Sequence, residues 1–217
     1  MSQPSLSQTA QRQPVGNTSR LDFIQATTGV LLILFLWCHV FLVSSVIISP
    51  KLMNAIAWFF EATLMCQVGG PIVLLLMVYH FVVAARKMPF RVGEFQIFWN
   101  NAKAMKHKDT WLWVVQVISA IFVLVMVSIH VYVVLSTLPI SAAKSAARVQ
   151  GGWLPFFLVL LPMAELHLGI GFYRLGVKYG FITRASRHVW QRNENVMTGI
   201  FIVIGLLTLT RFMLLSA

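Results

Sequence analysis

The chain has 217 residues, of which 58% are hydrophobic and only 11% are charged. A soluble domain of this size cannot cover so much apolar surface with so few charges, so the composition indicates an integral membrane protein. The 17 Lys and Arg residues outnumber the 6 Asp and Glu residues, but most of them lie between apolar segments. That distribution is the topology pattern of membrane proteins, and it argues against nucleic acid as a partner.

The N-terminal segment and the cysteines narrow the class further. Residues 1–20 are polar and predict a tail of disordered character. No short apolar core with a cleavage site precedes the first apolar segment, so we expect no removable signal peptide. Cys38 and Cys66 belong to no CxxC or CxxCH motif, so covalent haem attachment is not expected.

The first two apolar segments are bounded by helix-breaking residues. The first begins at Leu21 and ends at Ser49-Pro50. The second is interrupted by Gly69-Gly70-Pro71, where the proline predicts a kink that membrane helices tolerate. Residues 90–108 are polar and basic, and they predict a connection with at most a short surface helix.

Three more apolar segments follow. Asp109-Thr110 predicts the N-cap of the third segment, which Pro139 ends. Residues 141–152 and 180–195 are expected to be loops. The chain is therefore predicted to be an all-α membrane protein with five transmembrane helices, at about residues 21–48, 59–85, 111–138, 153–177 and 196–215.

The basic residues predict the orientation of these helices. Thirteen of the 17 Lys and Arg residues lie in the N-terminal tail, in residues 86–108 and in residues 174–192. The remaining four lie on the other side of the predicted membrane. The positive-inside rule therefore places the N-terminus in the cytoplasm and the C-terminus outside.

Four histidines lie inside apolar segments, one in each of four predicted helices. Ionisable residues at that depth are costly unless they are paired, ligated or solvated, so they are candidates for function. At about 1.5 Å rise per residue, His80 and His167 lie about 9 and 16 Å from the cytoplasmic ends of their helices. His39 and His130 lie about 26 and 30 Å from those ends. Two levels result, with His80 and His167 near the cytoplasm and His39 and His130 towards the outside.

Each level supplies one histidine from each of two helices, as bis-imidazole ligation of a haem iron requires. We therefore predict a haem-binding bundle with two haems that carry electrons. The alternative for a single membrane histidine is a hydrogen bond between helices, but four histidines at two matched depths favour haem. His107 and His188 fall in basic loops and are expected to be solvated.

Two carboxylates accompany the histidines. Glu61 is expected near the outer interface, where it could accept a proton from a quinol as electrons enter the outer haem. The alternative is a glutamate that simply faces water. Glu165 lies about mid-membrane and two residues from His167, so the two side chains point in different directions. We interpret Glu165 as a proton-path residue, with a hydrogen bond to a neighbouring helix as the alternative.

Four further side chains are candidates for contacts with haem propionates. Arg174 and Lys178 lie at the cytoplasmic end of the fourth predicted helix, and Gln25 and Trp113 lie at a similar depth. For Arg174 and Lys178 the alternative is a basic side chain that extends to the membrane surface.

Several separated motifs resemble the dihaem cytochrome b subunit of bacterial quinol:fumarate reductases. They cover about residues 21–210 and occur in the expected order. They are Leu21-Asp22 with Gln25 and Thr28-Gly29, Gly69-Gly70-Pro71, Ala85-Arg86-Lys87-Met88-Pro89, His107-Lys108-Asp109-Thr110-Trp111-Leu112-Trp113, Ser128-Ile129-His130-Val131-Tyr132, Glu165-Leu166-His167 and Tyr173-Arg174-Leu175.

The resemblance implies a five-helix anchor in the bacterial inner membrane. It implies two b haems, the outer held by His39 and His130 and the inner by His80 and His167. Glu61 matches the position tied to menaquinol oxidation, and the Glu165 position matches one proposed for a transmembrane proton path. The family holds a flavoprotein (FAD) subunit and an iron–sulfur subunit on the cytoplasmic face, commonly as a dimer of heterotrimers.

The sequence thus predicts a subunit of a menaquinol:fumarate reductase, which oxidises menaquinol while fumarate is reduced on a partner subunit. The same subunit working as a succinate:menaquinone reductase is the alternative, because the sequence does not set the direction. A haem-free proton channel or transporter that uses His and Glu side chains is a remote alternative. Such proteins often contain internal repeats, and the sequence contains no clear one.

Overall fold

The computed structural model describes residues 15–89 and 91–216. Within these ranges, five helical segments are long and apolar enough to cross a membrane. The prediction of an all-α membrane protein with five transmembrane helices is confirmed. The α-helices are α1 (Val15–Ser44), α2 (Pro50–Ala62), α3 (Met65–Ala85), α4 (Val92–Met105), α5 (Lys108–Ser136), α6 (Ala142–Arg148), α7 (Leu154–Lys178) and α8 (Arg187–Leu214). A short 3₁₀ helix, η1 (Ser45–Ile47), follows α1, and a short π-helix, η2 (Val149–Trp153), precedes α7.

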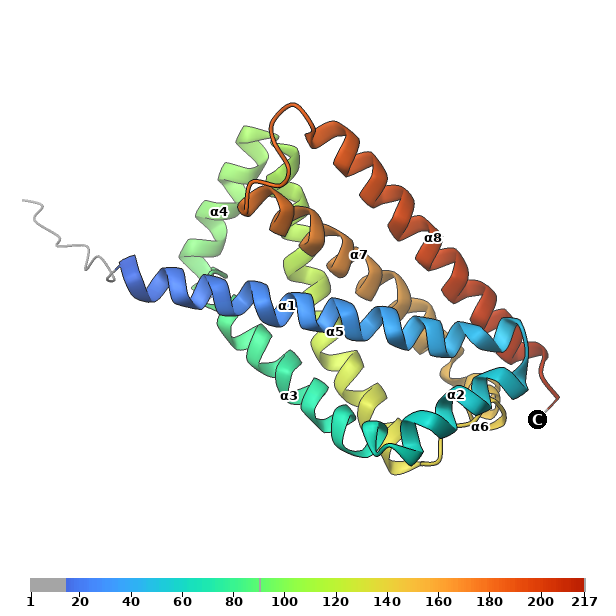
Figure 1. Ribbon diagram of the computed structural model, residues 1–217. Coiled ribbons are helices and arrows are strands. Elements are labelled where there is room, and N and C mark those ends of the chain that lie inside the picture. The colour runs from blue at the N-terminus through green and yellow to red at the C-terminus, as the bar shows by residue number, and fades with distance from the viewer. Residues whose placement is uncertain (1–14, 90, 217) are drawn as a thin grey trace, which may run out of the picture.

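The membrane-spanning helices are α1, α3, α5, α7 and α8. α7 packs between α5 and α8, and α3 packs between α1 and α5. Figure 1 shows α4 at the end of the bundle where α1 begins, and α2 and α6 at the opposite end, near the C-terminus. We call these the α4 end and the α2–α6 end.

The second predicted helix is two helices in the structure. The chain turns at Leu64, whose positive φ of 57° interrupts the helix, and α3 then continues through Pro71. α2 begins separately at Pro50, where the Ser49 side chain accepts a hydrogen bond from the Lys51 backbone N–H. The break therefore lies between α2 and α3, and the spanning helix runs over Met65–Ala85 where the sequence predicted 59–85.

Connections expected to be loops contain helical structure. α4 occupies most of residues 90–108, and α6 lies within residues 141–152. α8 begins at Arg187, well before the expected start of the fifth span, and the N-cap of α5 is His107 instead of Asp109-Thr110. Of the predicted polar tail, residues 1–14 lie outside the described part, and α1 already begins at Val15.

The buried apolar core lies at the α2–α6 end. There, the Asn54 side chain accepts a hydrogen bond from the Ala142 backbone N–H over 2.8 Å and ties α2 to α6. Many large apolar side chains along the spanning helices are exposed instead, as a lipid-facing surface requires. The core cluster consists of Leu42, Val46, Met53, Ala142, Ala146, Val149 and Phe212.

Ion pairs and hydrogen bonds hold the helix ends together at the α4 end. The Asp22 carboxylate of α1 pairs with Arg86, with Lys87 at 2.8 Å and with Lys178 at 3.1 Å. These pairs join α1 to the C-terminal ends of α3 and α7.

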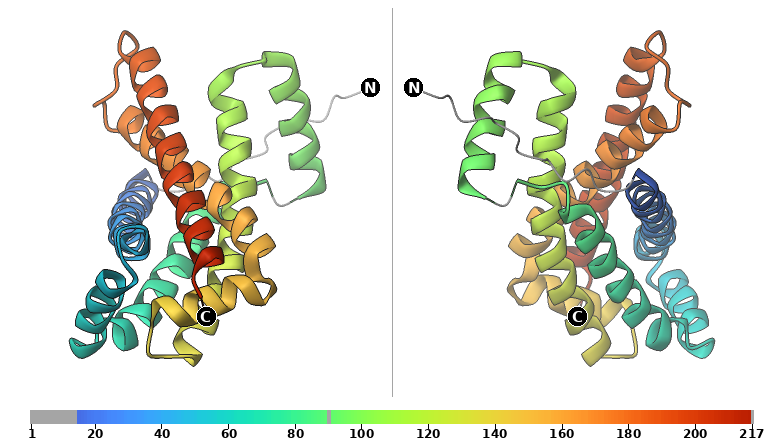
Figure 2. Two further views of the ribbon diagram at one scale, coloured as in Figure 1. Left: turned by 90° about the vertical axis from the view of Figure 1, so that its right-hand side faces the viewer. Right: turned by 90° about the vertical axis from the view of Figure 1, so that its left-hand side faces the viewer.

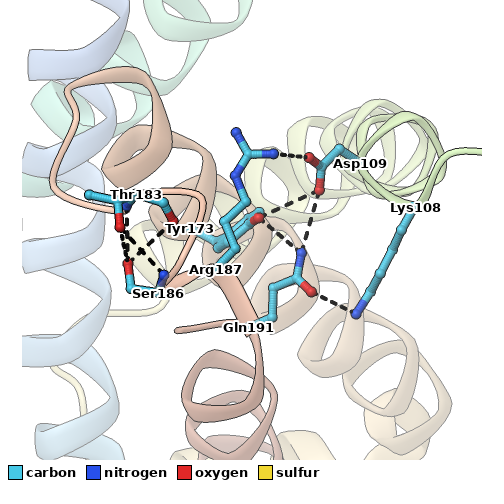
Figure 3. A network of polar contacts seen from close by, with 7 residues as sticks. All are labelled: Lys108, Asp109, Tyr173, Thr183, Ser186, Arg187 and Gln191. Carbon is cyan, nitrogen blue, oxygen red and sulfur yellow. Dashed lines mark hydrogen bonds and ion pairs between the residues drawn. The ribbon is translucent and has the colours of Figure 1, made fainter. Parts of the chain in front are cut away.

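A second network joins α5, α7 and α8 at the same end (Figure 3). Arg187 pairs with Asp109 at 3.2 Å, and the Gln191 side chain donates to the Tyr173 hydroxyl over 2.9 Å. Lys108 donates to the Gln191 side-chain oxygen over 2.9 Å. The two networks fix the helix ends around the mouth of a central cavity.

Candidate functional site

A cavity of about 750 Å³ opens between α1, α3, α5 and α7 towards the α4 end. His80 of α3 and His167 of α7 both line it. The volume lies within the range of about 300–1,000 Å³ that is usual for ligand and cofactor sites. The four side chains predicted to contact propionates, which are Gln25, Trp113, Arg174 and Lys178, line the same cavity.

Thr28 of α1 holds the His80 ring. The Thr28 hydroxyl donates to the Ile24 carbonyl over 2.8 Å, so its oxygen is left to accept from His80 Nδ1, which lies 2.9 Å away. The proton of a neutral ring is then on Nδ1, and the Nε2 lone pair is free to ligate a metal.

Gly29 gives the His80 ring its space. A Cβ atom at position 29 would lie 3.2 Å from His80 Cε1, which is tighter than an ordinary side-chain contact. Thr28 therefore accepts a hydrogen bond from the His80 ring, and Gly29 leaves room for the ring because it has no side chain.

The backbone of α5 holds the His167 ring. His167 Nδ1 lies 3.1 Å from the Gln116 carbonyl oxygen, and Ser119 Oγ lies 3.4 Å away. Because a carbonyl can only accept, Nδ1 carries the proton and the Nε2 lone pair is again free. Both rings at the cavity thus have their Nε2 lone pairs free to ligate a metal.

The structure brings His39 of α1 and His130 of α5 together nearer the α2–α6 end. Their ring centroids lie 5.9 Å apart at an interplanar angle of 71°. Two imidazoles on opposite sides of one metal would have centres about 6 Å apart, since each metal–nitrogen bond is about 2 Å and each nitrogen lies about 1 Å from its ring centre. Phe35 stacks on His39, and Phe157 packs edge-on against His130.

These residues fit haem better than a metal ion bound by protein ligands alone. Within residues 15–89 and 91–216, no three His, Cys, Asp or Glu side chains come together as a metal site. A haem iron needs only two axial ligands from the protein, because the porphyrin supplies the others. The buried Gln25 side-chain oxygen, which has no hydrogen-bond partner, is a further sign that a polar group belongs in the cavity.

Glu61 lies in α2, next to the break before α3. Its carboxylate accepts a hydrogen bond from the Ile140 backbone N–H in the connection from α5 to α6. Its neighbours Phe59 and Phe60 line a separate apolar cavity of about 550 Å³ between α1 and α2, which also contacts Cys38 beside His39. The structure therefore places Glu61 at the α2–α6 end, at the same end of the bundle as His39 and His130.

Glu165 is buried, with 3% of its surface exposed. It lies one helical turn from Leu161 and from Gly169, both of which contact α8. A Cβ atom at Gly169 would collide with Glu194 and Thr198, and Leu161 packs where Gly205 leaves room. Glu165 therefore faces the seam between α7 and α8, away from the cavity that His167 lines.

Several residues that contact the histidines were not predicted from the sequence. Thr28 could have been predicted from its depth in the membrane. It lies six residues after Asp22, and His80 lies six residues before Arg86. Because Asp22 pairs with Arg86, Thr28 and His80 lie at the same level. Gln116 acts through its backbone carbonyl, so its side-chain identity carries no signal.

Arg148 was also missed, because it lies in a segment expected to be a loop. Its guanidinium donates to the Thr137 hydroxyl over 2.9 Å near the end of α5. It is therefore a cation at the α2–α6 end, where a carboxylate of a ligand could pair with it.

The chain is similar to known membrane subunits of respiratory enzymes. Residues 96–208 match the family model of the succinate dehydrogenase/fumarate reductase transmembrane subunit. The chain is 36% identical over 205 residues to the fumarate reductase cytochrome b subunit of Helicobacter pylori, covering 89% of this chain and 80% of that one. It is 31% identical over 215 residues to the corresponding subunit of Wolinella succinogenes, covering 92% and 84% of the two chains.

The chain belongs to the family of succinate dehydrogenase and fumarate reductase transmembrane subunits. The resemblance inferred from the sequence motifs is confirmed. The five spanning helices agree with a transmembrane subunit of this family.

Proposed function

We propose that this chain is the dihaem cytochrome b subunit of a menaquinol:fumarate reductase. The observation that carries the proposal is the arrangement of four histidines as two pairs, with the Nδ1 atoms of His80 and His167 both engaged and their Nε2 atoms free. The relatives in Helicobacter pylori and Wolinella succinogenes are named as fumarate reductase cytochrome b subunits, which supports the same activity.

At the inner site, His80 and His167 would hold the iron of one haem b in the cavity. Thr28 and the Gln116 carbonyl orient the two rings, as outer partners of metal-bound histidines commonly do. Gln25, Trp113, Arg174 and Lys178 line the cavity and would hold the haem propionates, and Lys178 also pairs with Asp22. When bound, the haem would supply one-electron transfer.

At the outer site, His39 and His130 would hold the iron of a second haem b. Phe35 and Phe157 pack against the two rings. Arg148 supplies a cation near this end. Electrons from a quinol oxidised near the α2–α6 end would then cross the membrane from the outer pair to the inner pair.

Glu61 would act where menaquinol is oxidised. Each menaquinol gives up two electrons and two protons, so its oxidation needs a nearby base that accepts a proton. Glu61 lies at the α2–α6 end and holds one carboxylate oxygen on the Ile140 backbone N–H, which positions the side chain. Glu165, buried at the seam between α7 and α8, is assigned to a proton path through the membrane.

The α4 end would face the cytoplasm and the partner subunits. Twelve of the 16 Lys and Arg residues in the described part of the chain belong to segments at this end, which supports an N-terminus in the cytoplasm of a bacterial inner membrane. A flavoprotein subunit and an iron–sulfur subunit would dock there, beside the inner haem, and the complex would assemble as a dimer of heterotrimers. Fumarate would be reduced on the flavoprotein, because this chain has no cluster of cysteines for iron and sulfur and only two cysteines in all.

Haem content tests the proposal. Reduced-minus-oxidised spectra of the purified complex are expected to show two low-spin b haems per chain. Replacing any one of His39, His80, His130 and His167 by Ala should lower that content by about one haem, since a bis-histidine site cannot keep its geometry with one ligand. The exposed His188→Ala serves as the matched control and should keep both haems. A colourless wild-type protein, or an equal loss in the control, would refute the assignment.

A further inference from the structure

One side of α4 carries an exposed strip of aromatic and basic side chains. We define the aromatic–basic strip as Val92, Phe95, Trp99 and Lys103 of α4 with Trp111 of α5. The α4 members follow the spacing of three and four residues that places side chains on one helix face. Val92 is 84% exposed and Phe95 is 53% exposed.

The members of the strip contact one another. Phe95 stacks on Trp99 with ring centroids 6.0 Å apart, and Trp111 meets Trp99 edge-on at 5.5 Å. Lys103 Nζ lies 5.3 Å from the centre of the Trp99 ring. The ammonium group is thus held over an aromatic face with its other side open, where an anion could bind it.

The strip lies at the level of the lipid headgroups. α5 has 29 residues and is therefore about 43 Å long, whereas the hydrocarbon core of a bilayer is about 30 Å thick. The excess must lie in the interfacial layers, and Trp111 is in the first turn of α5. Because Trp99 contacts Trp111 and Phe98 contacts Trp113, the middle of α4 lies at this interfacial depth as well.

α4 also lies at the side of the bundle, where lipid would surround it. Figure 2 shows α4 standing beside α5, on the far side from α7 and α8. Trp side chains are enriched at membrane–water interfaces because the ring is apolar and the N–H is polar. Basic side chains beside them attract anionic headgroups.

We propose that the aromatic–basic strip binds an anionic phospholipid of the leaflet at the α4 end. The phosphate of the headgroup would pair with Lys103, and the exposed Lys106, three residues later at the end of α4, would add positive charge. The acyl chains would lie against Val92 and Phe95. This site is separate from the haem cavity, and it does not depend on the electron-transfer function.

Lipid binding to the purified complex tests the inference. Phosphatidylglycerol and phosphatidylcholine with identical acyl chains are titrated into the complex in neutral detergent, and bound lipid is counted by native mass spectrometry. Wild-type protein is expected to bind phosphatidylglycerol more tightly. Lys103→Gln should weaken that binding about fivefold and leave phosphatidylcholine unchanged, because one basic residue near an anionic surface has an effect of that size.

Lys51→Gln is the matched control, because it removes one exposed lysine charge at the α2–α6 end. It should leave the binding of phosphatidylglycerol unchanged. Equal affinity for the two lipids, or equal loss in the two variants, would overturn the inference. Protection of Lys103 from an amine-reactive reagent in the delipidated complex would overturn it too, since a partner subunit would then cover the strip.

Discussion

The Nδ1 atom of His80 lies 2.9 Å from the Oγ1 atom of Thr28, and this contact determines which ring nitrogen is free. The Thr28 hydroxyl already donates to the Ile24 carbonyl, so it can only accept from the ring. At His167 the Gln116 carbonyl has the same role over 3.1 Å. Two different acceptors, a side chain and a backbone group, therefore leave the Nε2 atoms of two histidines from different helices free at the same cavity.

Thr28→Val is expected to weaken haem binding at the inner site. The change keeps the shape of the side chain but removes the acceptor for His80 Nδ1–H, which leaves a buried donor without a partner. Loss of such an outer partner typically lowers metal affinity about 10–100-fold. Haem per chain, measured in stepwise denaturant, should show one haem lost earlier than in the wild type.

The matched control is Thr210→Val in α8. The Thr210 hydroxyl also donates to a carbonyl four residues earlier, over 2.9 Å, but it is exposed and contacts no histidine. Both haems should be retained as in the wild type. Early haem loss in both variants would mean that the general effect of Thr→Val in a helix is responsible, and the role of Thr28 would be rejected.

Gly169→Ala is expected to destabilise the contact between α7 and α8. A Cβ atom at this position would collide with the Glu194 carboxylate and the Thr198 hydroxyl. Forcing an extra methyl group into a packed contact costs about 1–3 kcal/mol. The thermal midpoint of the purified protein should fall accordingly.

Gly199→Ala in α8 is the control for the Gly169 variant. A Cβ atom at Gly199 would meet no other atom within 4 Å, so the substitution adds helix propensity without a clash. Stability should stay the same or rise by up to about 1 kcal/mol. Equal thermal midpoints for the two variants would contradict the packing of α7 on α8 described above.

Hydrophobic length made the spanning helices predictable, but not the short helices between them. An uninterrupted apolar stretch has to cross the bilayer as a helix, because no water is available for its backbone. The end of α2 depends instead on distant contacts, since Glu61 binds the Ile140 N–H and Asn54 binds the Ala142 N–H. Contacts between residues about 80 positions apart leave no local pattern, so the break at Leu64 could not be placed from the sequence.

Part of the candidate site was predictable for a similar reason. Depth along a helix is fixed by residue count, and that was sufficient to pair His39 with His130, which the structure places side by side. The rotation of a helix about its own axis is set by packing. The sequence therefore could not predict that the Glu165 side chain faces α8. The role of the Gln116 carbonyl could not be predicted either, because every residue has a backbone carbonyl.

Glu165→Gln is expected to slow coupled turnover without loss of haem. The amide keeps nearly the same shape as the carboxylic acid, so the packing of α7 on α8 should persist, but the side chain can no longer carry a proton. Fumarate reduction with a menaquinol analogue, measured in proteoliposomes beside haem per chain, distinguishes the two effects. Full coupled activity in this variant would reduce Glu165 to a packing residue.

Glu61→Gln is expected to remove most menaquinol oxidation while both haems stay bound. The glutamine oxygen can still accept from the Ile140 N–H, so α2 should keep its position against the connection from α5 to α6. What is lost is a base, and general-base catalysis contributes about 10²–10⁴-fold to a rate. Steady-state oxidation of a menaquinol analogue by the complex should fall by a factor in that range, with an unchanged haem spectrum.

An electron donor that bypasses the quinol site distinguishes a loss of menaquinol oxidation from a general defect of the complex. Fumarate reduction driven by a soluble dye that bypasses the quinol site should proceed at the wild-type rate in Glu61→Gln. Glu94→Gln in the exposed part of α4 removes the same charge far from the α2–α6 end, and it should leave both rates unchanged. If menaquinol oxidation survives in Glu61→Gln, the proton acceptor lies elsewhere and Glu61 serves only to anchor α2.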